Sequence, residues 1–297
     1  MRNHHNYTVF LYHGNDSTID NDRDTAIDHG NDATNQSNNL QQGGTSVKRS
    51  HDELLALDLS FGLPLVGTLD KLVRGSLSRV QAEMSLKVLV QEGNEFKFVK
   101  ALSALVTRLP RFPMEEGANE AELCMRFVDP FLTGLFDDPD NGVYLRWTNE
   151  TTTVVKQNNG CPDLCITKSR GVKWGADCGY GEAKPAVRDN DHYLVCMNLI
   201  RMAVLSKEAL NKQYLDGALG IQIVGQTLMF YVLLLPAEGI YALLQLVDVK
   251  IPDSLQSLSH LVMDVSNSLS VTDAFDRLCV CSNDPGQKLL KWLFNSS

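Results

Sequence analysis

The most apolar stretch of the chain, Leu219 to Val249, places the strongest constraint on what the chain can fold into. Four polar residues and a proline interrupt this stretch, at Gln222, Gln226, Pro236, Glu238 and Gln245. A stretch interrupted in this way is unsuited to spanning a membrane. It divides into β-rich runs at 219–224, 227–235 and 240–251, and residues 236–239 read as a hairpin turn. The sequence therefore predicts strands buried in a sheet.

The segments before this stretch predict a helix, three strands and a second helix. Asn119 is a good N-cap for a helix that bends near Pro130, and a turn follows at 137–142. Alternating side chains indicate strands at 143–148, 162–168 and 172–185. Asp191 caps the second helix, about residues 192–210, which is apolar on most faces and is expected to be buried. The order helix, three strands, helix, strands predicts an α/β fold.

Composition divides the chain into three parts. Residues 1–50 hold eight Asn, six Asp and four of the seven His, with almost nothing to bury beyond Val9–Tyr12, and predict a disordered tail. Residues 51–115 read as a helical N-terminal layer, broken or bent at Pro64 and Gly67. Residues 116–297 form the main domain, closed by helices at about 255–281 and 285–294.

Charge, cysteine content and the chain start narrow the class of protein. A net charge of −9 argues against a protein that coats nucleic acid through charge alone. Nothing at the start reads as a signal peptide, so we expect an intracellular protein of the nucleus or cytoplasm, neither secreted nor in a membrane. Seven cysteines lack C-x-x-C spacing, and Cys161, Cys165, Cys178 and His192 match no standard zinc site. Reduced thiols, several of them buried, are the better interpretation.

Three acidic residues and a lysine carry the chemistry that the sequence predicts. Glu182 and Lys184 point to one face of a strand because side chains alternate, and Asp163 lies on the strand before it. Where the two strands pair, both carboxylates meet and create an oxygen-rich site for Mg²⁺. A divalent cation with a lysine beside it suits phosphodiester hydrolysis, since the metal activates water and stabilises developing charge. Glu120 can reach this site from the preceding helix.

These residues resemble the motifs of the PD-(D/E)XK nuclease-like superfamily. The matching residues are Pro162-Asp163, Gly181-Glu182-Ala183-Lys184, Asn119-Glu120 and Phe127-Val128-Asp129-Pro130. With Leu135-Phe136, the chain looks more narrowly like the uncharacterised members found in many copies in fungal genomes, a copy-rich type often linked to mobile elements. The likeness covers about residues 118–250 and implies a restriction-endonuclease-like core with additional terminal helices.

The resemblance also implies roles for individual residues. Asp163 and Glu182 would bind Mg²⁺, or Mn²⁺, together with the Ala183 carbonyl, and Lys184 would be the catalytic lysine. Glu120 would be the helix glutamate, with Glu122 as its competitor. Glu120 is favoured because it shares a helical stripe with apolar residues that face the sheet. The implied activity is a metal-dependent nuclease acting on DNA or RNA.

Simpler interpretations stay open beside this one. Asp163 is also suited to start a strand after a turn, and Glu182 with Lys184 to protect a sheet edge. Glu120 is also an ordinary first-turn acid. The fold could therefore serve as a catalytically inactive interaction or regulatory module, and the whole match could be coincidental.

Substrate and partners remain open at this stage. Cutting of both strands of a duplex would need a homodimer, and another protein could load the nuclease. Trp147 and Trp174 offer surfaces for base stacking, but Trp147 lies on the apolar side of its strand and is expected in the core. Several basic residues surround the proposed site in the sequence: Arg146, Lys168, Arg170, Lys173, Lys184, Arg188 and Arg201. They could form a local basic rim within an acidic protein.

Overall fold

A computed structural model of the chain describes residues 9–13, 51–90, 92–148, 162–185, 192–237 and 239–280. Its centre is a seven-stranded mixed sheet in the order β1-β7-β6-β5-β4-β3-β2. The strands are β1 (Val9–His13), β2 (Val143–Trp147), β3 (Leu164–Arg170), β4 (Lys173–Lys184), β5 (Gly217–Val224), β6 (Thr227–Ala237) and β7 (Ile240–Lys250). Only β4 and β5 run parallel, and every other pair is antiparallel. The predicted mixed α/β fold class is therefore confirmed.

Helix α6 (His192–Gln213) makes the β4–β5 connection and covers one face of the sheet. Parallel neighbours need such a crossover, whereas the antiparallel pairs β3–β4, β5–β6 and β6–β7 are joined by short turns. The gap of only two residues between β5 and β6 contains Gly225, which has a positive φ of 54°. The crossover through α6 thus brings β5 alongside β4 in the same direction, so the carboxyl ends of the two strands lie together.

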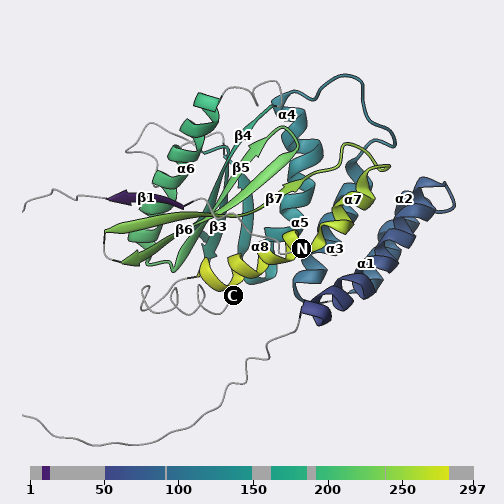
Figure 1. The fold of residues 1–297 in the computed structure, drawn as a ribbon, viewed down its shortest axis with the longest axis horizontal. Helices are drawn as coiled ribbons and strands as arrows, with labels where there is room; N and C mark the ends of the chain where they lie inside the picture. The colour runs from purple at the N-terminus through teal and green to yellow at the C-terminus, as the bar shows by residue number, and fades with distance from the viewer. Residues whose placement is uncertain are drawn as a thin grey trace, which may run out of the picture.

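Helices on the opposite face share one apolar core with the sheet. They are α1 (His51–Val73), α2 (Arg79–Leu89), α3 (Gly93–Arg108), α5 (Asp129–Phe136), α7 (Leu258–Met263) and α8 (Val265–Leu278). Figure 1 shows α6 on one side of the sheet and these helices on the other, with α1 and α2 outermost. Buried side chains of α3 and α5, such as Leu102 and Phe131, belong to the same cluster as Leu164 and Ile221 of the sheet. The N-terminal helical layer thus packs as part of the core.

The helix before the first predicted strand has an irregular middle. Asn119 caps α4 (Glu120–Glu122) as predicted, because its side chain accepts a hydrogen bond of 2.9 Å from the Glu122 amide. A π-helical turn, η1 (Leu123–Val128), then leads into α5, where Pro130 lies in the first turn. The Asp129 amide donates to the Cys124 carbonyl five residues back, as a π turn requires. A short 3-10 helix, η2 (Pro139–Asn141), connects α5 to β2.

Three predictions differ from the structure. Helix α1 continues through Pro64 and Gly67 without a break, and the Thr68 hydroxyl donates to the Pro64 carbonyl within it. Residues 9–13, inside the predicted disordered tail, pair with β7, because Val9–Tyr12 supplies the few apolar side chains of that segment. The expected burial of the 192–210 helix is wrong for the outer face of α6, where Tyr193, Met197, Ile200 and Val204 are exposed. The rest of residues 1–50 and the predicted helix at 285–294 lie outside the described residues.

Candidate functional site

Asp163 directly precedes β3 and lies against the last residues of β4. The Asp163 amide donates to the Gly181 carbonyl, and this is the last backbone bond between the two strands. Beyond it, the Ala183 amide donates to Asp163 Oδ2 at 2.7 Å, so the carboxylate takes the place of a missing strand partner. The predicted meeting of these two strands near Asp163 is therefore present.

Lys184 contacts both Ala183 and Asp163 at the end of β4. Its ammonium donates to the Ala183 carbonyl at 2.7 Å and lies 3.7 Å from Asp163 Oδ2. The lysine and aspartate side chains are both partly shielded, at 19% and 32% exposed. One carboxylate, one backbone carbonyl and one ammonium thus converge at the carboxyl end of β4.

Glu182 is the buried member of the group. Its side chain is 2% exposed and faces α6, where Arg201 Nη1 donates to Oε2 at 3.4 Å. Arg201 Nη2 also lies 3.3 Å from Oε1, but Oε1 forms no hydrogen bond with any described residue. Burial, with the nearby Asp163 charge, raises the pKa of Glu182 from 4.5 to about 7. The carboxyl group is therefore poised to change its protonation state near neutral pH.

Glu120 influences Glu182 electrostatically. It begins α4 with an exposed side chain, and its negative charge contributes to the raised pKa of Glu182. Burial raises the pKa of Cys124, one turn further along, to about 12, and the charges of Asp163 and Glu120 add to this. The competitor Glu122 instead pairs with Arg126 at 3.0 Å on the outer side of the helix. The structure therefore places Glu120, rather than Glu122, in the electrostatic neighbourhood of Asp163 and Glu182.

The donor set fits a hard divalent cation in composition. Asp163 Oδ2, the Ala183 carbonyl and the unbonded Glu182 Oε1 are oxygen atoms, which Mg²⁺ prefers. Magnesium is commonly held by only one or two carboxylates and keeps several waters. Within the described ranges, no three His, Cys, Asp or Glu side chains lie close enough together to form a metal-binding cluster. The predicted ligands Asp163, Ala183 and Glu182 are thus adjacent, but among the described residues no third acidic side chain completes a cluster with them.

The sequence did not single out the partners of Glu182 on the α6 side. Arg201 is only one of seven basic residues near the site in the sequence, and its pairing depends on how α6 docks on the sheet. Gln222 pairs with Glu182 across β4 and β5, and its amide donates to the Val195 carbonyl of α6. Alternation along β5 places Gln222 on the same face as Glu182, and this is the signal that could have found it.

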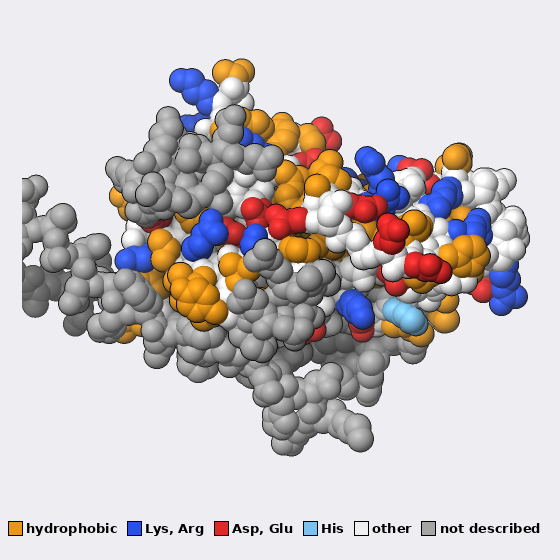
Figure 2. Space-filling view, turned by 90° about the horizontal axis from the view of Figure 1, so that it is seen from above, with side chains coloured by type: hydrophobic (Ala, Val, Ile, Leu, Met, Phe, Trp, Pro, Cys, Tyr) orange, Lys and Arg blue, Asp and Glu red, His pale blue; other side chains and the backbone are white. Residues whose placement is uncertain are grey.

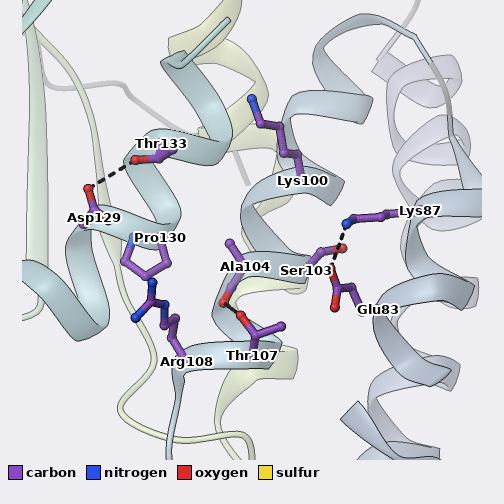
Figure 3. A pocket seen from close by; sticks show the side chains of 10 residues that line it. All are labelled: Glu83, Lys87, Lys100, Ser103, Ala104, Thr107, Arg108, Asp129, Pro130 and Thr133. Atoms are coloured by element: carbon purple, nitrogen blue, oxygen red, sulfur yellow. Dashed lines mark hydrogen bonds and ion pairs between the residues drawn. The ribbon is translucent and has the colours of Figure 1, made fainter. Parts of the chain in front are cut away.

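A separate pocket of about 320 Å³ lies between α2, α3 and α5 (Figure 3). Its polar side chains are largely occupied with one another: Lys87 pairs with Glu83 at 2.7 Å, and Thr133 donates to Asp129. Asp129 also accepts from the Trp147 indole at 2.8 Å, which ties β2 to α5 and places Trp147 against the core as predicted. None of the predicted site residues lines this pocket.

The surface charge is mixed. Figure 2 shows acidic and basic side chains close together among hydrophobic ones on the face seen from above. Such a surface attracts phosphate groups only over short distances, as the net charge of −9 also indicates. No helix in the described part of the chain is long and apolar enough to cross a membrane. Comparison of the chain with protein-family models, with curated proteins and with solved structures gives no match.

Proposed function

We propose that the chain is a Mg²⁺-dependent nuclease of the PD-(D/E)XK type that cleaves phosphodiester bonds in DNA or RNA. The carrying observation is the convergence of Asp163, the Ala183 carbonyl and Lys184 at the end of β4, with Glu182 beside them. The succession α5, β2–β4, α6 and β5, with β5 parallel to β4, also supports a restriction-endonuclease-like core. Mg²⁺, or Mn²⁺ in its place, would be held by Asp163, Glu182 and Ala183.

Each residue has a chemical task in this proposal. When bound, the cation supplies Lewis-acid stabilisation of the scissile phosphate and an acidified water. Asp163 and Glu182 provide the negative charge that binds the cation, and Arg201 limits the cost of the buried Glu182 carboxylate. Lys184 exchanges its contact with the Ala183 carbonyl for the attacking water or the phosphate oxygen, and so orients or stabilises the reacting group.

The proposal is tested by cleavage of plasmid DNA and RNA by the purified full chain with Mg²⁺ or Mn²⁺. Asp163→Asn retains an oxygen that can accept from the Ala183 amide but loses the charge, and Lys184→Ala removes the ammonium. We expect each variant to lose about 10²-fold or more in rate. Asp248→Asn and Lys250→Ala are the matched controls, because both residues are exposed on β7 of the same sheet. Equal rates in all five proteins would contradict the proposed site.

A second candidate, an inactive nuclease-fold protein that serves as an interaction or regulatory module, is favoured by one observation. Lys184 is bonded to the Ala183 carbonyl and Arg201 pairs with Glu182, so charges inside the group already compensate one another. Calorimetry with Mg²⁺ separates the two proposals. Cation binding that Asp163→Asn abolishes supports the nuclease, whereas neither binding nor cleavage by the wild type supports the inactive module.

A further inference from the structure

Strands β2 and β4 bring together an aromatic and basic cluster, Tyr144, Arg146 and Trp174, which we call the Trp174 platform. The Arg146 guanidinium lies 4.2 Å from the centroid of the Trp174 ring. The Tyr144 ring packs edge-on against it, with centroids 5.3 Å apart and planes at 81°. Trp174 is nevertheless 55% exposed. Two neighbours thus fix the orientation of an indole that still presents much of its surface to solvent.

The hairpin that carries Trp174 is basic within an acidic chain. Residues 164–176 hold Lys168, Arg170 and Lys173 and no Asp or Glu, whereas the whole chain has a net charge of −9. Arg170 and Lys173 are exposed on either side of the turn at Gly171. Lys168 instead donates to the Cys279 carbonyl at 3.4 Å. Arg170 and Lys173 pair with each other, so alternation places both on the face opposite Trp174, and Arg146 is the cation that lies beside the Trp174 ring.

The platform lies on the same face of the sheet as the candidate site. Arg146 pairs with Cys165, which pairs with Tyr180, and paired residues point to one face. Asp163 comes two residues before Cys165 and Glu182 two residues after Tyr180, so alternation places their side chains on this face. Trp174 and Glu182 are eight residues apart along β4, which corresponds to about 26 Å at about 3.3 Å per residue. Tyr180 lies between them and is buried in the cluster that α6 forms with the sheet, so the platform and the candidate site are two separate places on one face.

We infer that the Trp174 platform binds a single-stranded segment of the nucleic acid substrate, with a base stacked on Trp174 and an adjacent phosphate near Arg146. This inference rests on the proposed function, since it assigns a second contact to the nucleic acid that the site at Asp163 would cleave. Bases in a single strand have a free face for stacking, whereas those inside a duplex are stacked on their neighbours. Stacking also does not depend on net charge, so it suits an acidic protein.

Binding of fluorescently labelled single-stranded DNA and RNA of about 12 nucleotides tests the inference, a length within the range of about 4–16 that one domain covers. The full chain is titrated in EDTA, so that no cleavage occurs, and anisotropy is measured. Trp174→Ala is expected to weaken binding about ten-fold or more, and Trp174→Phe to recover most of it. Arg146→Gln should weaken binding and lower its dependence on salt.

Matched variants and circular dichroism distinguish lost stacking from lost folding. Phe112→Ala removes another exposed aromatic ring and Arg74→Gln another exposed cation, and both should bind as the wild type does. If Trp174→Ala binds the single strand as tightly as the wild type does, the inference is contradicted. It is also contradicted if the wild type binds a blunt duplex of the same sequence as tightly as the single strand. Where Trp174→Ala alters the fold, unchanged binding by Arg146→Gln at every salt concentration contradicts the inference.

Different experimental results would contradict the Trp174 platform and the proposed nuclease function. Asp163→Asn should abolish cleavage but bind the oligonucleotide as the wild type does. Binding that depends on Trp174, in a protein that does not cleave nucleic acid with Mg²⁺ or Mn²⁺, supports the platform and contradicts the nuclease. Cleavage that depends on Asp163, with binding that is insensitive to Trp174, supports the nuclease and contradicts the platform.

Discussion

Glu182 is a carboxyl group that folding removes from water beside a second carboxylate. Its pKa rises from 4.5 to about 7 because of burial first and the Asp163 charge second. In the metal-free protein the folded state therefore binds more protons than the unfolded state between these two pH values. The contribution of Glu182 to stability is fully present below pH 4.5 and is lost as pH rises through about 7.

Glu182→Gln should remove this dependence on pH. A shift from 4.5 to about 7 corresponds to about 3 kcal/mol, so we expect the variant to gain up to that amount over the wild type at pH 8. The two proteins should be much closer in stability at pH 5, where Glu182 is largely protonated in the folded state. Urea denaturation of the metal-free proteins at both pH values measures the difference.

Glu122→Gln is the control for this comparison. Glu122 is 40% exposed and pairs with Arg126 at the surface, so its replacement should change stability by less than about 1 kcal/mol at either pH. The same stability difference between Glu182→Gln and the wild type at pH 5 and pH 8 would contradict the raised pKa.

At the scale of the elements, α5 packs closely against α3. A Cβ atom added at Gly134 of α5 would overlap the backbone N and Cα atoms of Ala101 in α3. Backbone atoms cannot move aside as a flexible side chain does, so the two helices would have to separate. Because only a short connection with η2 separates α5 from β2, their separation would also disturb the sheet.

Gly134→Ala should therefore destabilise the protein by about 1–3 kcal/mol, the usual cost of overpacking a core. Gly67→Ala in α1 is the matched control, because no atom lies within 4 Å of the added Cβ. There the change should stabilise the helix by about 0.5–1 kcal/mol. Urea midpoints of the two variants measure both effects, and a loss of the same size in both would show that α3 and α5 do not pack closely.

Local patterns predict most of these elements, because turns and alternation are properties of neighbouring residues. Strands β2 to β7 and the N-cap Asn119 agree with the prediction within a few residues. Helix burial is harder to predict, since it depends on contacts that are distant in sequence. The apolar residues Met197 and Ile200 suggest a buried helix on every side, but α6 packs with one face only.

The same distinction applies to the candidate site. Alternation and strand pairing predict that Asp163 meets the end of β4, and the structure brings them together. The pairing of Arg201 with Glu182 depends on the docking of α6, which no local pattern encodes.

At the scale of the whole molecule, the described helices and sheet fold around a shared core. Leu65 of α1 and Leu102 of α3 belong to the same buried cluster as Phe230 of β6 and Phe275 of α8. Lys97 of α3 also pairs with Asp276 of α8, across most of the chain length. The boundary at residues 115 and 116, which composition suggests, therefore divides the sequence but does not separate two cores.

A protein of residues 116–297 should consequently fail to fold by itself. Its sheet would expose the apolar surface that α3 covers. The loss of each buried leucine costs about 2–5 kcal/mol, so the loss of several exceeds a typical free energy of unfolding of about 5–15 kcal/mol. A protein of residues 51–297 should keep a cooperative transition, because the described part of the segment it lacks is the single strand β1 at the edge of the sheet. Thermal unfolding followed by circular dichroism compares both with the full chain. A cooperative transition in 116–297 would contradict the shared core and identify this part as an independent domain.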